Sequence, residues 1–382
     1  MIKQVDPKAS YLAHQDEIDA AIKRCLNSGL YILGQEVESF EKEFSDFLGA
    51  RHCVSVASGT DALVLAMSAC GIKSGDVVIT VSHTAGATVA AIEILGAAPL
   101  LIDVDPRTYL MEADILDEAI QELQSTDPAK AERLKAIVVV HLYGCPAYMY
   151  SINDVAARHG LFVIEDCAQA HGATINRAMV GTLGHVSAFS FYPTKNLGAF
   201  GDGGAVVTND DNLAESVQLL RQYGWKDRYI SQRPGYNSRL DEIQAAILRV
   251  KLKYLESDNA KRIEIAGRYS RALESVDLQL PKEIFGRQHV YHQFVIQTSN
   301  RDNFRSYLAE SGISTGIHYK IPIHLQPAYS VRKLTWPDKL ENTESLCDRI
   351  VSLPMSPYLR RDEINQVCDA VTKWFQQENG RL

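Results

Sequence analysis

The sequence predicts an α/β protein with a mainly parallel, seven-stranded sheet, helices on both faces, and a smaller α+β domain after it. Three observations predict this class. Short apolar runs alternate with helical patterns over the first two-thirds of the 382 residues. Most of these runs are continuously apolar, as in strands that are covered on both faces. After about residue 250 the alternation stops, so we divide the chain into a large domain, residues 1–250, and a small C-terminal domain, residues 251–382.

Two helices are predicted before the first strand. Apolar side chains recur three or four positions apart over Asp16–Asn27 and Glu36–Leu48, which places them on one face of each helix. Gly29 and Gly49 follow these patterns as stops, because glycine readily takes the left-handed conformation that ends many helices.

Seven runs are predicted to be strands. They are rich in β-branched and aliphatic residues, and helical patterns lie between most of them. This order favours parallel strands that are joined by helices. The seven runs are His52–Ala57, Val77–Val81, Leu100–Val104, Ile137–Leu142, Phe162–Asp166, Ala188–Tyr192 and Ala205–Thr208.

The patterns after the last of these strands are mostly helical. A long amphipathic pattern runs from Asp241 to about Leu273 and is interrupted near Ser257–Asp258. The remaining predicted elements are a strand over 292–296, a helix over 302–311, a loop rich in His, Pro and Tyr over 318–329, and a final helix over 362–377.

The composition argues against several classes of function. The chain has 39 Lys and Arg against 47 Asp and Glu, a net charge of −8, whereas a nucleic-acid-binding protein needs a basic face. No run reaches the roughly 20 apolar residues that cross a bilayer, and we expect no signal peptide. The seven cysteines are scattered and form no CxxC pair. We therefore expect a cytoplasmic protein with reduced thiols, no metal site, and no nucleic-acid or membrane partner.

Three segments carry residues that are suited to chemistry. In the first, Ser58-Gly59-Thr60 follows a predicted strand and opens a helix. The N-terminus of a helix presents free N–H groups to anions, and glycine lets a ligand approach closely. Taken alone, this segment also fits an ordinary turn with Ser58 as the helix N-cap.

The second and third segments supply an acid and a lysine. Val163–Gln169 ends an apolar strand with Glu165 and Asp166, and ligands of open parallel sheets bind at the carboxyl ends of strands. A carboxylate there can hold a cationic heteroaromatic nitrogen, although Asp166 by itself fits a helix N-cap better. Lys195 stands among aromatic residues and glycines. A lysine shielded from water becomes a nucleophile for carbonyl groups, whereas a single lysine more often faces solvent.

The three segments together are far more informative than each one alone. An anion cradle, an acid at a strand end and a shielded lysine follow one another on one predicted sheet. Pyridoxal 5'-phosphate (PLP) needs these three groups: a cradle for its phosphate, a carboxylate for its ring nitrogen and a lysine for its aldehyde. The glycines after Lys195 do not form the G-x-G-x-x-G pattern, so a nicotinamide-dependent oxidoreductase is poorly supported.

Six motifs connect the sequence to a known family. They are Ser58–Leu63 (SGTDAL), Val140–Gly144 (VHLYG), Ile164–Gly172 (IEDCAQAHG), Ser190–Leu197 (SFYPTKNL), Gly235–Asp241 (GYNSRLD) and His318-Tyr319. Through them the sequence closely resembles the DegT/DnrJ/EryC1/StrS family of PLP-dependent sugar aminotransferases, from about Tyr31 to Pro357. The resemblance implies the aspartate aminotransferase-like fold, which is PLP fold type I.

The resemblance also implies roles for residues around the cofactor. Lys195 matches the lysine that binds the cofactor aldehyde and moves the proton during the reaction. Asp166 matches the partner of the pyridine nitrogen, and Gln169 matches the glutamine beside the ring hydroxyl. The residues that match phosphate ligands are Gly59, Thr60 and Ser190.

Further matches concern the partner subunit and the substrate. Asn237 matches an asparagine that reaches the phosphate from the neighbouring subunit, which implies a homodimer with shared active sites. Some of the residues that match the substrate side also have a structural interpretation. Residues 318–324 could be a structural loop with hydrogen-bonded histidines, and Arg239 could form an ion pair with Asp241. The residues expected on the substrate side are Tyr31, Arg239, His318, Tyr319 and His324.

One motif departs from the family. Many members have an aromatic residue that stacks on the pyridine ring in a Thr-Phe-x-Ala-Thr motif, and Ala85 takes that position here. His83 is the nearest available ring, so we expect His83 to stack on the cofactor. The Ser82–Ala85 pattern also resembles the branch of the family that acts at C3 of dTDP-3-keto-6-deoxyhexoses.

The function implied by the resemblance is transamination in amino-sugar biosynthesis, such as that of lipopolysaccharide or other glycans. An amino group moves from L-glutamate to a nucleotide-linked keto-sugar, for which a dTDP-3-keto-6-deoxyhexose is expected. Amination at C4 is an alternative, and so is a PLP-binding regulator without turnover. A sugar dehydratase is disfavoured, because family members of that kind have histidine in place of Lys195.

Overall fold

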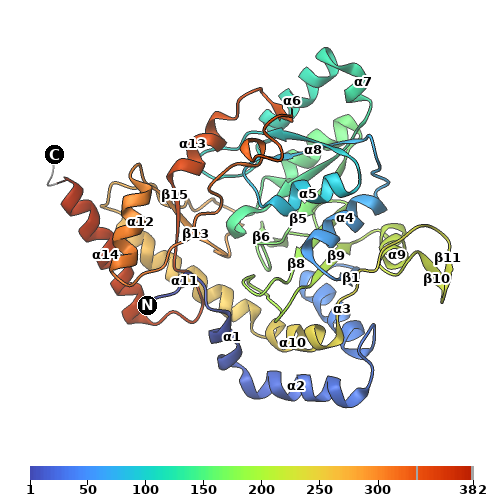
Figure 1. Ribbon diagram of the computed structural model, residues 1–382, viewed down its shortest axis with the longest axis horizontal. Helices are drawn as coiled ribbons and strands as arrows, with labels where there is room; N and C mark the ends of the chain where they lie inside the picture. The colour runs from blue at the N-terminus through green and yellow to red at the C-terminus, as the bar shows by residue number, and fades with distance from the viewer. Residues whose placement is uncertain (333, 380–382) are drawn as a thin grey trace.

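An eight-stranded sheet forms the centre of the protein (Figure 1). The computed structural model describes residues 1–332 and 334–379. The strand order is β1-β9-β8-β5-β4-β2-β3-β14, and neighbouring strands are parallel except where they pair with β9. The strands are β1 (His52–Val56), β2 (Val77–Val81), β3 (Ala98–Ile102), β4 (Leu134–Val140), β5 (Phe162–Asp166), β8 (Val186–Ser190), β9 (Gly204–Thr208) and β14 (Thr335–Trp336).

All seven predicted strands are present in this sheet, and its mainly parallel architecture is confirmed. The predicted strand number is wrong by one, because β14 adds an eighth strand beside β3. β14 has only the two residues Thr335 and Trp336, too few for the alternation of side chains that identifies a strand. β3 begins two residues earlier than predicted, since its Ala98 pairs with Val77 of β2.

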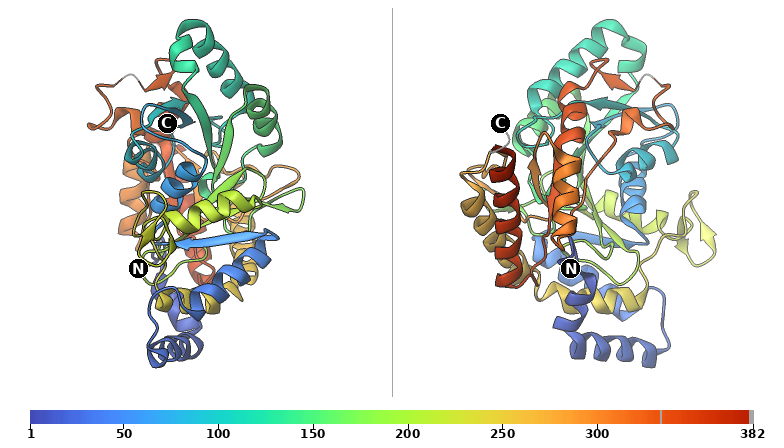
Figure 2. Two further views of the ribbon diagram at one scale, coloured as in Figure 1. Left: turned by 90° about the vertical axis from the view of Figure 1, so that its right-hand side faces the viewer. Right: turned by 60° about the vertical axis from the view of Figure 1, so that its left-hand side comes forward.

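Helices cover both faces of the sheet and bury one apolar cluster on each face (Figures 1 and 2). Because side chains alternate along a strand, Val163 of β5 joins one cluster and Ile164 joins the other. The first cluster includes residues of α3 (Gln35–Leu48), α6 (Ala113–Thr126), α8 (Met149–His159) and α10 (Glu242–Leu252). The second includes residues of α4 (Gly59–Ala69), α5 (Gly86–Ile94) and α9 (Asp211–Leu220).

The N-terminal helices end where the sequence predicts. α2 (Gln15–Ser28) and α3 stop at Gly29 and Gly49, whose φ angles of 70° and 69° are left-handed. The remaining short elements are α1 (Pro7–Ala13), α7 (Pro128–Ala131), β6 (Thr174–Ile175), β7 (Ala178–Met179), the β10 (Trp225–Asp227) and β11 (Ile230–Ser231) hairpin, and β12 (Arg287–Gln288).

A carboxylate from a distant helix supports the start of α3. Glu242, the first residue of α10, is 2 % exposed. It accepts hydrogen bonds from the N–H groups of Gly34, Glu36 and Val37 at 2.8, 3.0 and 2.9 Å. The first N–H groups of a helix have no partner within the helix, and a negative charge suits that end of the helix dipole. This contact therefore joins α3 firmly to α10.

The C-terminal part forms a third apolar cluster, away from the sheet (Figure 2). It contains α11 (Leu255–Leu273), α12 (Arg301–Glu310), α14 (Arg361–Asn379) and the antiparallel pair β13 (Phe294–Gln297) and β15 (Ile350–Leu353), whereas α13 (Glu341–Arg349) lies toward the sheet. The long helical pattern breaks at Lys253–Tyr254, earlier than predicted. Apart from Ile2, the cluster begins at Ile265, and the domain division near residue 250 stays a prediction. Among the described residues, no helix is both long and apolar enough to cross a bilayer.

Candidate active site

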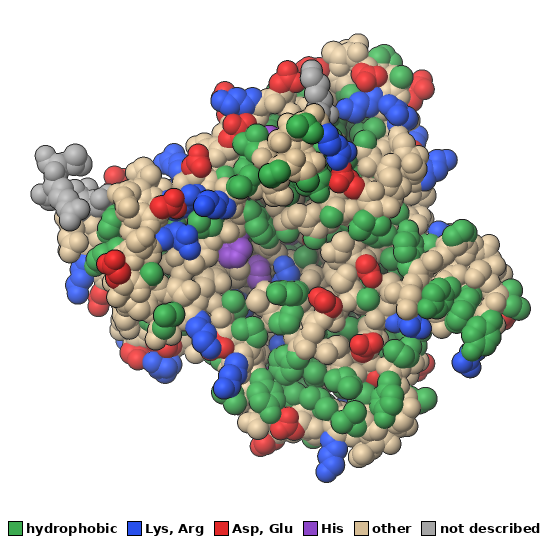
Figure 3. Space-filling model, in the orientation of Figure 1, with side chains coloured by type: hydrophobic (Ala, Val, Ile, Leu, Met, Phe, Trp, Pro, Cys, Tyr) green, Lys and Arg blue, Asp and Glu red, His purple; other side chains and the backbone are tan. Residues whose placement is uncertain are grey.

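A cavity of about 340 Å³ opens at the carboxyl ends of the parallel strands. Its wall includes Val140, Asp166 and Ser190, which are the last residues of β4, β5 and β8. In Figure 3, histidine side chains lie beside a hollow near the middle of the face shown. The predicted site residues that line the cavity are Gly59, Thr60, Asp166, Gln169, Ser190, Lys195, His318 and Tyr319.

The first turn of α4 forms one part of the cavity wall. Ser58 caps this helix, because its Oγ accepts a hydrogen bond from the N–H of Asp61 at 3.1 Å. Gly59 lies so close to Ser190 that an added Cβ would be 2.4 Å from the Ser190 Cβ. Only glycine fits at this position. The helix N-terminus, with the hydroxyls of Thr60 and Ser190 beside it, forms a cradle that suits a phosphate group.

Asp166 ends β5 with its carboxylate buried beside the cavity. Its Oδ2 accepts a hydrogen bond from the Thr88 hydroxyl at 2.9 Å, and its Oδ1 accepts one from the N–H of Ala168 at 3.2 Å. Burial raises the pKa of the Asp166 carboxyl, while these two hydrogen bonds and the nearby Lys195 lower it. A buried carboxylate of this kind is suited to pair with a cationic group inside the cavity.

Lys195 lies on the loop after β8, and its side chain lines the same cavity as Asp166. Burial lowers the pKa of the Lys195 amine to about 8, against the opposite effect of Asp166. More of the amine is therefore neutral near pH 7 than in a lysine surrounded by water, and the neutral amine is the form that attacks a carbonyl. The loop is held in place by the Lys251 ammonium, which donates a hydrogen bond to the carbonyl of Gly198.

Gln169, His318 and Tyr319 form another part of the wall. Nε2 of Gln169 donates to the Tyr319 hydroxyl at 3.1 Å, and its Oε1 accepts the N–H of Tyr143 at 2.6 Å. Nδ1 of His318 lies 2.7 Å from the Ser352 hydroxyl. Burial lowers the pKa of His318 to about 4 and raises the pKa of Tyr319 to about 12. Both side chains are therefore uncharged near neutral pH.

Two predicted site residues do not reach the cavity. His83, which we expected to stack on the cofactor, is 1 % exposed, and its Nε2 lies 2.9 Å from the Tyr143 hydroxyl. His324, expected on the substrate side, is also buried, and its Nδ1 lies 2.7 Å from the Ser82 hydroxyl. The structure does not support either prediction. His83 lies outside any helix or strand, and His324 lies in a single 3₁₀ turn, Ile323–Leu325, so no periodic sequence pattern could give the direction of these side chains.

Three further predicted residues lie at the surface, outside this cavity. Tyr31 is 50 % exposed, Asn237 is exposed, and Arg239 is partly buried. Within the described part of the chain, Arg239 forms no ion pair, so the alternative of a salt bridge is not observed. Ser238, between the last two, donates a hydrogen bond from its hydroxyl to Asp61 at 2.6 Å, which places this segment beside the first turn of α4. The predicted roles of the three residues stay predictions.

Sequence reasoning missed three residues of the site. Thr88 donates its hydroxyl to Asp166, and Tyr143 donates its backbone N–H to Gln169. Both lie within segments that were already of interest. The Thr88 hydroxyl was a usable signal, whereas a backbone N–H gives none. His292 lines the cavity with its Nδ1 3.2 Å from an oxygen of Asn196. It stands just before β13, where no local pattern indicates a site.

A buried cluster beside the cavity contains residue types that can bind a metal. His141, Glu165 and Cys167 lie together below the end of β5. The Glu165 oxygens accept three backbone N–H groups at 2.6 to 2.8 Å and face Nε2 of His141 at 3.0 Å. Nδ1 of His141 accepts the N–H of Ala147 at 2.9 Å. Since these atoms already have partners, we interpret the cluster as support for β5.

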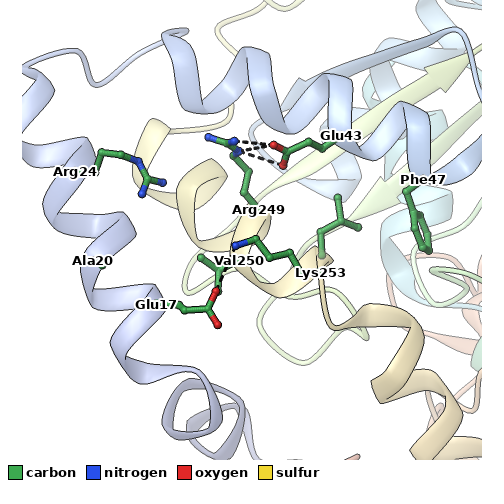
Figure 4. Close-up of a pocket in the computed structure, with 9 residues that line it drawn as sticks. Glu17, Ala20, Arg24, Glu43, Phe47, Arg249, Val250 and Lys253 are labelled. Atoms are coloured by element: carbon green, nitrogen blue, oxygen red, sulfur yellow. Dashed lines mark hydrogen bonds and ion pairs between the residues drawn. The ribbon is translucent and has the colours of Figure 1, made fainter.

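A separate hollow lies between α2, α3 and α10 (Figure 4). Four of its charged side chains pair with one another, Arg249 with Glu43 at 2.6 Å and Lys253 with Glu17 at 3.3 Å. Arg24, which also lines the hollow, pairs with Glu36 at 2.7 Å. Side chains that are paired in this way offer little to a ligand. We therefore place the functional site at the ends of the strands.

Comparison with known proteins agrees with the geometry of this site. The model of the DegT/DnrJ/EryC1/StrS aminotransferase family matches residues 13–372. The chain belongs to this family. A dTDP-3-amino-3,6-dideoxy-alpha-D-galactopyranose transaminase from Aneurinibacillus thermoaerophilus is 45 % identical over 375 residues, which cover 98 % of this chain and 99 % of the relative.

Two further relatives extend the comparison. A UDP-2-acetamido-2-deoxy-3-oxo-D-glucuronate aminotransferase from Pseudomonas aeruginosa is 40 % identical, over 97 % of this chain and 100 % of the relative. The crystal structure of DesV from S. venezuelae, in complex with a ketimine intermediate, has a TM-score of 0.92 and 42 % identity over 98 % of both chains. The aspartate aminotransferase-like fold predicted from the sequence is therefore confirmed.

As a member of this family, the protein is a PLP-dependent aminotransferase. The residues of the cavity fit this cofactor. The first turn of α4 offers a close approach that a side chain at Gly59 would block. Asp166 offers a buried anion, and Lys195 offers an amine whose pKa is lowered to about 8. Phosphate, ring nitrogen and aldehyde thus each have a matching group in one cavity.

Proposed function

We propose that the protein transfers an amino group from L-glutamate to C3 of a nucleotide-linked 3-keto-6-deoxyhexose, with dTDP as the first candidate nucleotide. The observation that carries this proposal is the meeting of the α4 N-terminus, Asp166 and Lys195 in one cavity. The transaminase from Aneurinibacillus thermoaerophilus, which carries a dTDP-3-amino sugar in its name, supports amination at C3. The product is the corresponding 3-amino sugar.

Different residues of the chain would have different roles in the reaction. PLP supplies an electron sink for the charge that develops on the amino-acid donor. Asp166 would keep the ring nitrogen protonated, and the first turn of α4 would hold the phosphate. Lys195 would take the proton from the α-carbon of the donor and deliver it to the carbon of the cofactor's aldehyde group, which lies on the other side of the transferred nitrogen, because part of the Lys195 amine is neutral at working pH. Gln169 would hold the ring hydroxyl through its amide.

Product analysis tests this proposal. The protein would be incubated with L-glutamate and a panel of 3-keto and 4-keto sugars linked to dTDP or UDP, and the amino sugars identified by NMR. We expect amine at C3 of a dTDP-sugar. An amine at C4 would overturn the position. Turnover of UDP-sugars alone would instead favour the substrate class named for the Pseudomonas aeruginosa relative.

We also propose a homodimer in which each subunit completes the active site of the other. Asn237 is exposed and outside the cavity of its own chain, yet its neighbour Ser238 contacts the first turn of α4 through Asp61. Leu30, Tyr31 and Ile32 are 61 %, 50 % and 45 % exposed, and contiguous exposed apolar side chains are typical of interfaces.

Hybrid dimers test the sharing of sites. Subunits with Lys195→Ala and subunits with Asn237→Ala would be mixed under conditions that exchange subunits. If the sites are shared, one of the two sites in the hybrid has both intact residues, so activity returns on mixing. Mixed subunits that stay as inactive as the separate variants would contradict shared sites, and a monomer by light scattering would contradict the dimer.

We infer a cytoplasmic location from the thiols. All seven cysteines are free and buried. Unpaired cysteines are typical of reducing compartments. Recovery of the transaminase activity in the cytoplasmic fraction of the native cell is the expected result, and recovery in an extracytoplasmic fraction would contradict the inference.

A further inference from the structure

We propose that Tyr143 is a positioning residue of the active site, which His83 holds in place and which itself sets the positions of Gln169 and the His318-Tyr319 segment. This inference rests on the proposed function, in which these residues face the cofactor and the sugar. Tyr143 follows β4 with a φ angle of 60°, a left-handed conformation that bulky residues rarely adopt. Such conformations persist only where surrounding contacts impose them, and they cluster at functional sites.

The hydrogen bonds around Tyr143 have a fixed direction. The Tyr143 hydroxyl contacts the backbone carbonyl of His318, and a carbonyl can only accept, so the hydroxyl donates its single proton there. Nε2 of His83 lies 2.9 Å from the same hydroxyl oxygen. Nε2 must therefore carry a hydrogen and donate it to Tyr143. Nδ1 of His83 is then an acceptor, and it lies 3.7 Å from Sγ of Cys347, whose thiol can donate.

Burial keeps these groups in one protonation state. His83, Tyr143 and Cys347 are 1 %, 3 % and 2 % exposed. Burial lowers the pKa of His83 to about 4, raises the pKa of the Cys347 thiol to about 12, and raises the pKa of Tyr143 well above its usual value. All three side chains are neutral near pH 7. The hydrogen bonds therefore run in one direction, from Cys347 through His83 and Tyr143 to the carbonyl of His318.

A second contact of Tyr143 reaches the cofactor side of the cavity. Its backbone N–H donates to Oε1 of Gln169 at 2.6 Å. With its oxygen engaged in this way, the amide of Gln169 turns its NH₂ group toward the Tyr319 hydroxyl, 3.1 Å away, and toward the cavity that both residues line. Tyr143, Gln169, Tyr319 and His318 thus form a closed ring of contacts.

The two contacts of Tyr143 differ in how a substitution affects them. The hydroxyl holds the His318-Tyr319 segment, which we assign to the sugar, whereas the backbone N–H holds Gln169, which we assign to the cofactor. Removing the hydroxyl alone should therefore weaken the binding of the keto-sugar more than the binding of PLP or of L-glutamate. This split distinguishes positioning from a general loss of packing.

The test compares Tyr143→Phe with Tyr109→Phe in the PLP-loaded enzyme. The ring of Tyr109 is 5.3 Å from that of Tyr143 and is equally buried, but its hydroxyl bonds to Gln297 and not to the site. We expect Tyr143→Phe to raise the KM of the keto-sugar about 3- to 10-fold, the effect of one hydrogen bond. The rise in the KM of L-glutamate should be smaller. Tyr109→Phe should match the wild type.

Substitutions at His83 provide a second test that does not depend on the folding of Tyr143→Phe. His83→Leu removes the donor to Tyr143, whereas His83→Gln keeps an N–H in place of Nε2. We expect His83→Leu to raise the KM of the keto-sugar and His83→Gln to restore it. PLP affinity would be measured by titrating the apoprotein and following the absorbance. It should fall by less than about 2-fold in both variants, because His83 lies outside the cavity and would not touch the cofactor ring.

Each remaining outcome would overturn the inference. A keto-sugar KM that Tyr143→Phe leaves unchanged, or that Tyr109→Phe raises equally, would reduce Tyr143 to a packing role. Weakened PLP binding in His83→Leu with an unchanged keto-sugar KM would mean that His83 acts on the cofactor ring. A wild-type protein without PLP absorbance or transaminase turnover would instead refute the proposed function, so the two failures are distinguishable.

Discussion

Replacing Gly59 with alanine should weaken cofactor binding and also destabilise the protein. The added Cβ would be 2.4 Å from Cβ, 2.9 Å from Oγ and 3.0 Å from Cα of Ser190. Carbon atoms in contact are normally about 3.5–4.0 Å apart. The Cα belongs to the backbone at the end of β8, so turning the Ser190 side chain cannot remove the clash, and α4 must move away from the sheet.

The magnitude follows from two costs. Forcing an extra methyl group into a packed interior costs roughly 1–3 kcal/mol of stability. Moving the first turn of α4 also takes N–H groups away from the cofactor phosphate, and a hydrogen bond to a charged group contributes roughly 1.5–3 kcal/mol. Loss of one such bond corresponds to a roughly 10- to 150-fold higher Kd for PLP.

Gly86→Ala is the matched control. Gly86 is also the first residue of a helix, α5, but nothing lies within 4 Å of an added Cβ. Alanine there should stabilise the protein by roughly 0.4–1 kcal/mol, because alanine has fewer conformations to lose from the unfolded chain than glycine. Titration of each apoprotein with PLP and urea unfolding measure both quantities. A Gly59→Ala protein that binds PLP within 2-fold of the Gly86→Ala protein would refute the reasoning.

Four other predictions concern Lys195, Asp166 and Glu242. Lys195→Ala should still bind PLP but without a covalent link, so borohydride reduction followed by mass spectrometry should find no cofactor on the chain; wild-type turnover would contradict the assignment. Attachment of PLP to the apoprotein should speed up as the pH rises through about 8, because the neutral amine is the reactive form. Asp166→Asn should move the midpoint of this pH dependence to lower pH, since Asp166 raises the pKa of the Lys195 amine. Stopped-flow absorbance would measure the rate of PLP attachment at each pH. A shift of the midpoint to higher pH would contradict this effect of Asp166 on Lys195. Glu242→Ala leaves the N–H groups at the start of α3 without their acceptor. It should therefore lower the free energy of unfolding by roughly 1–3 kcal/mol, measured by urea unfolding. An unchanged urea midpoint would contradict this prediction.

The sequence predicts the sheet well because two-sided burial leaves a clear mark. Runs such as Val77–Val81 are buried at every position and apolar at all but Thr80, as expected for a strand that is covered by helices on both faces. β14 leaves no such mark, because its two residues join the sheet through pairing with β3 alone. The break between α10 and α11 is also misplaced, since helical patterns continue on both sides of Tyr254 and only the backbone shows where the helix ends.

The residues of the site also differ in how far the sequence predicts their positions. Asp166 and Ser190 end adjacent parallel strands, so the topology itself brings them together once the strands are recognised. His83 lies outside any helix or strand and His324 lies in a single 3₁₀ turn, so neither belongs to a periodic pattern from which the direction of its side chain could be predicted. Their hydrogen bonds to Tyr143 and Ser82 depend on contacts across the fold, which a single sequence does not reveal.

The loop that carries His318 and Tyr319 is attached to two different parts of the molecule. Gly316 pairs with Ser352 of β15 in the C-terminal cluster, whereas His324 is bonded to Ser82 after β2 of the large sheet. Residues 317–323 therefore span the distance between the two parts. Any displacement of the C-terminal cluster relative to the sheet would move this wall of the cavity without disturbing the strands. Under the proposed function, in which this wall faces the sugar, substitutions on the outside of that cluster would alter sugar preference without touching the sugar.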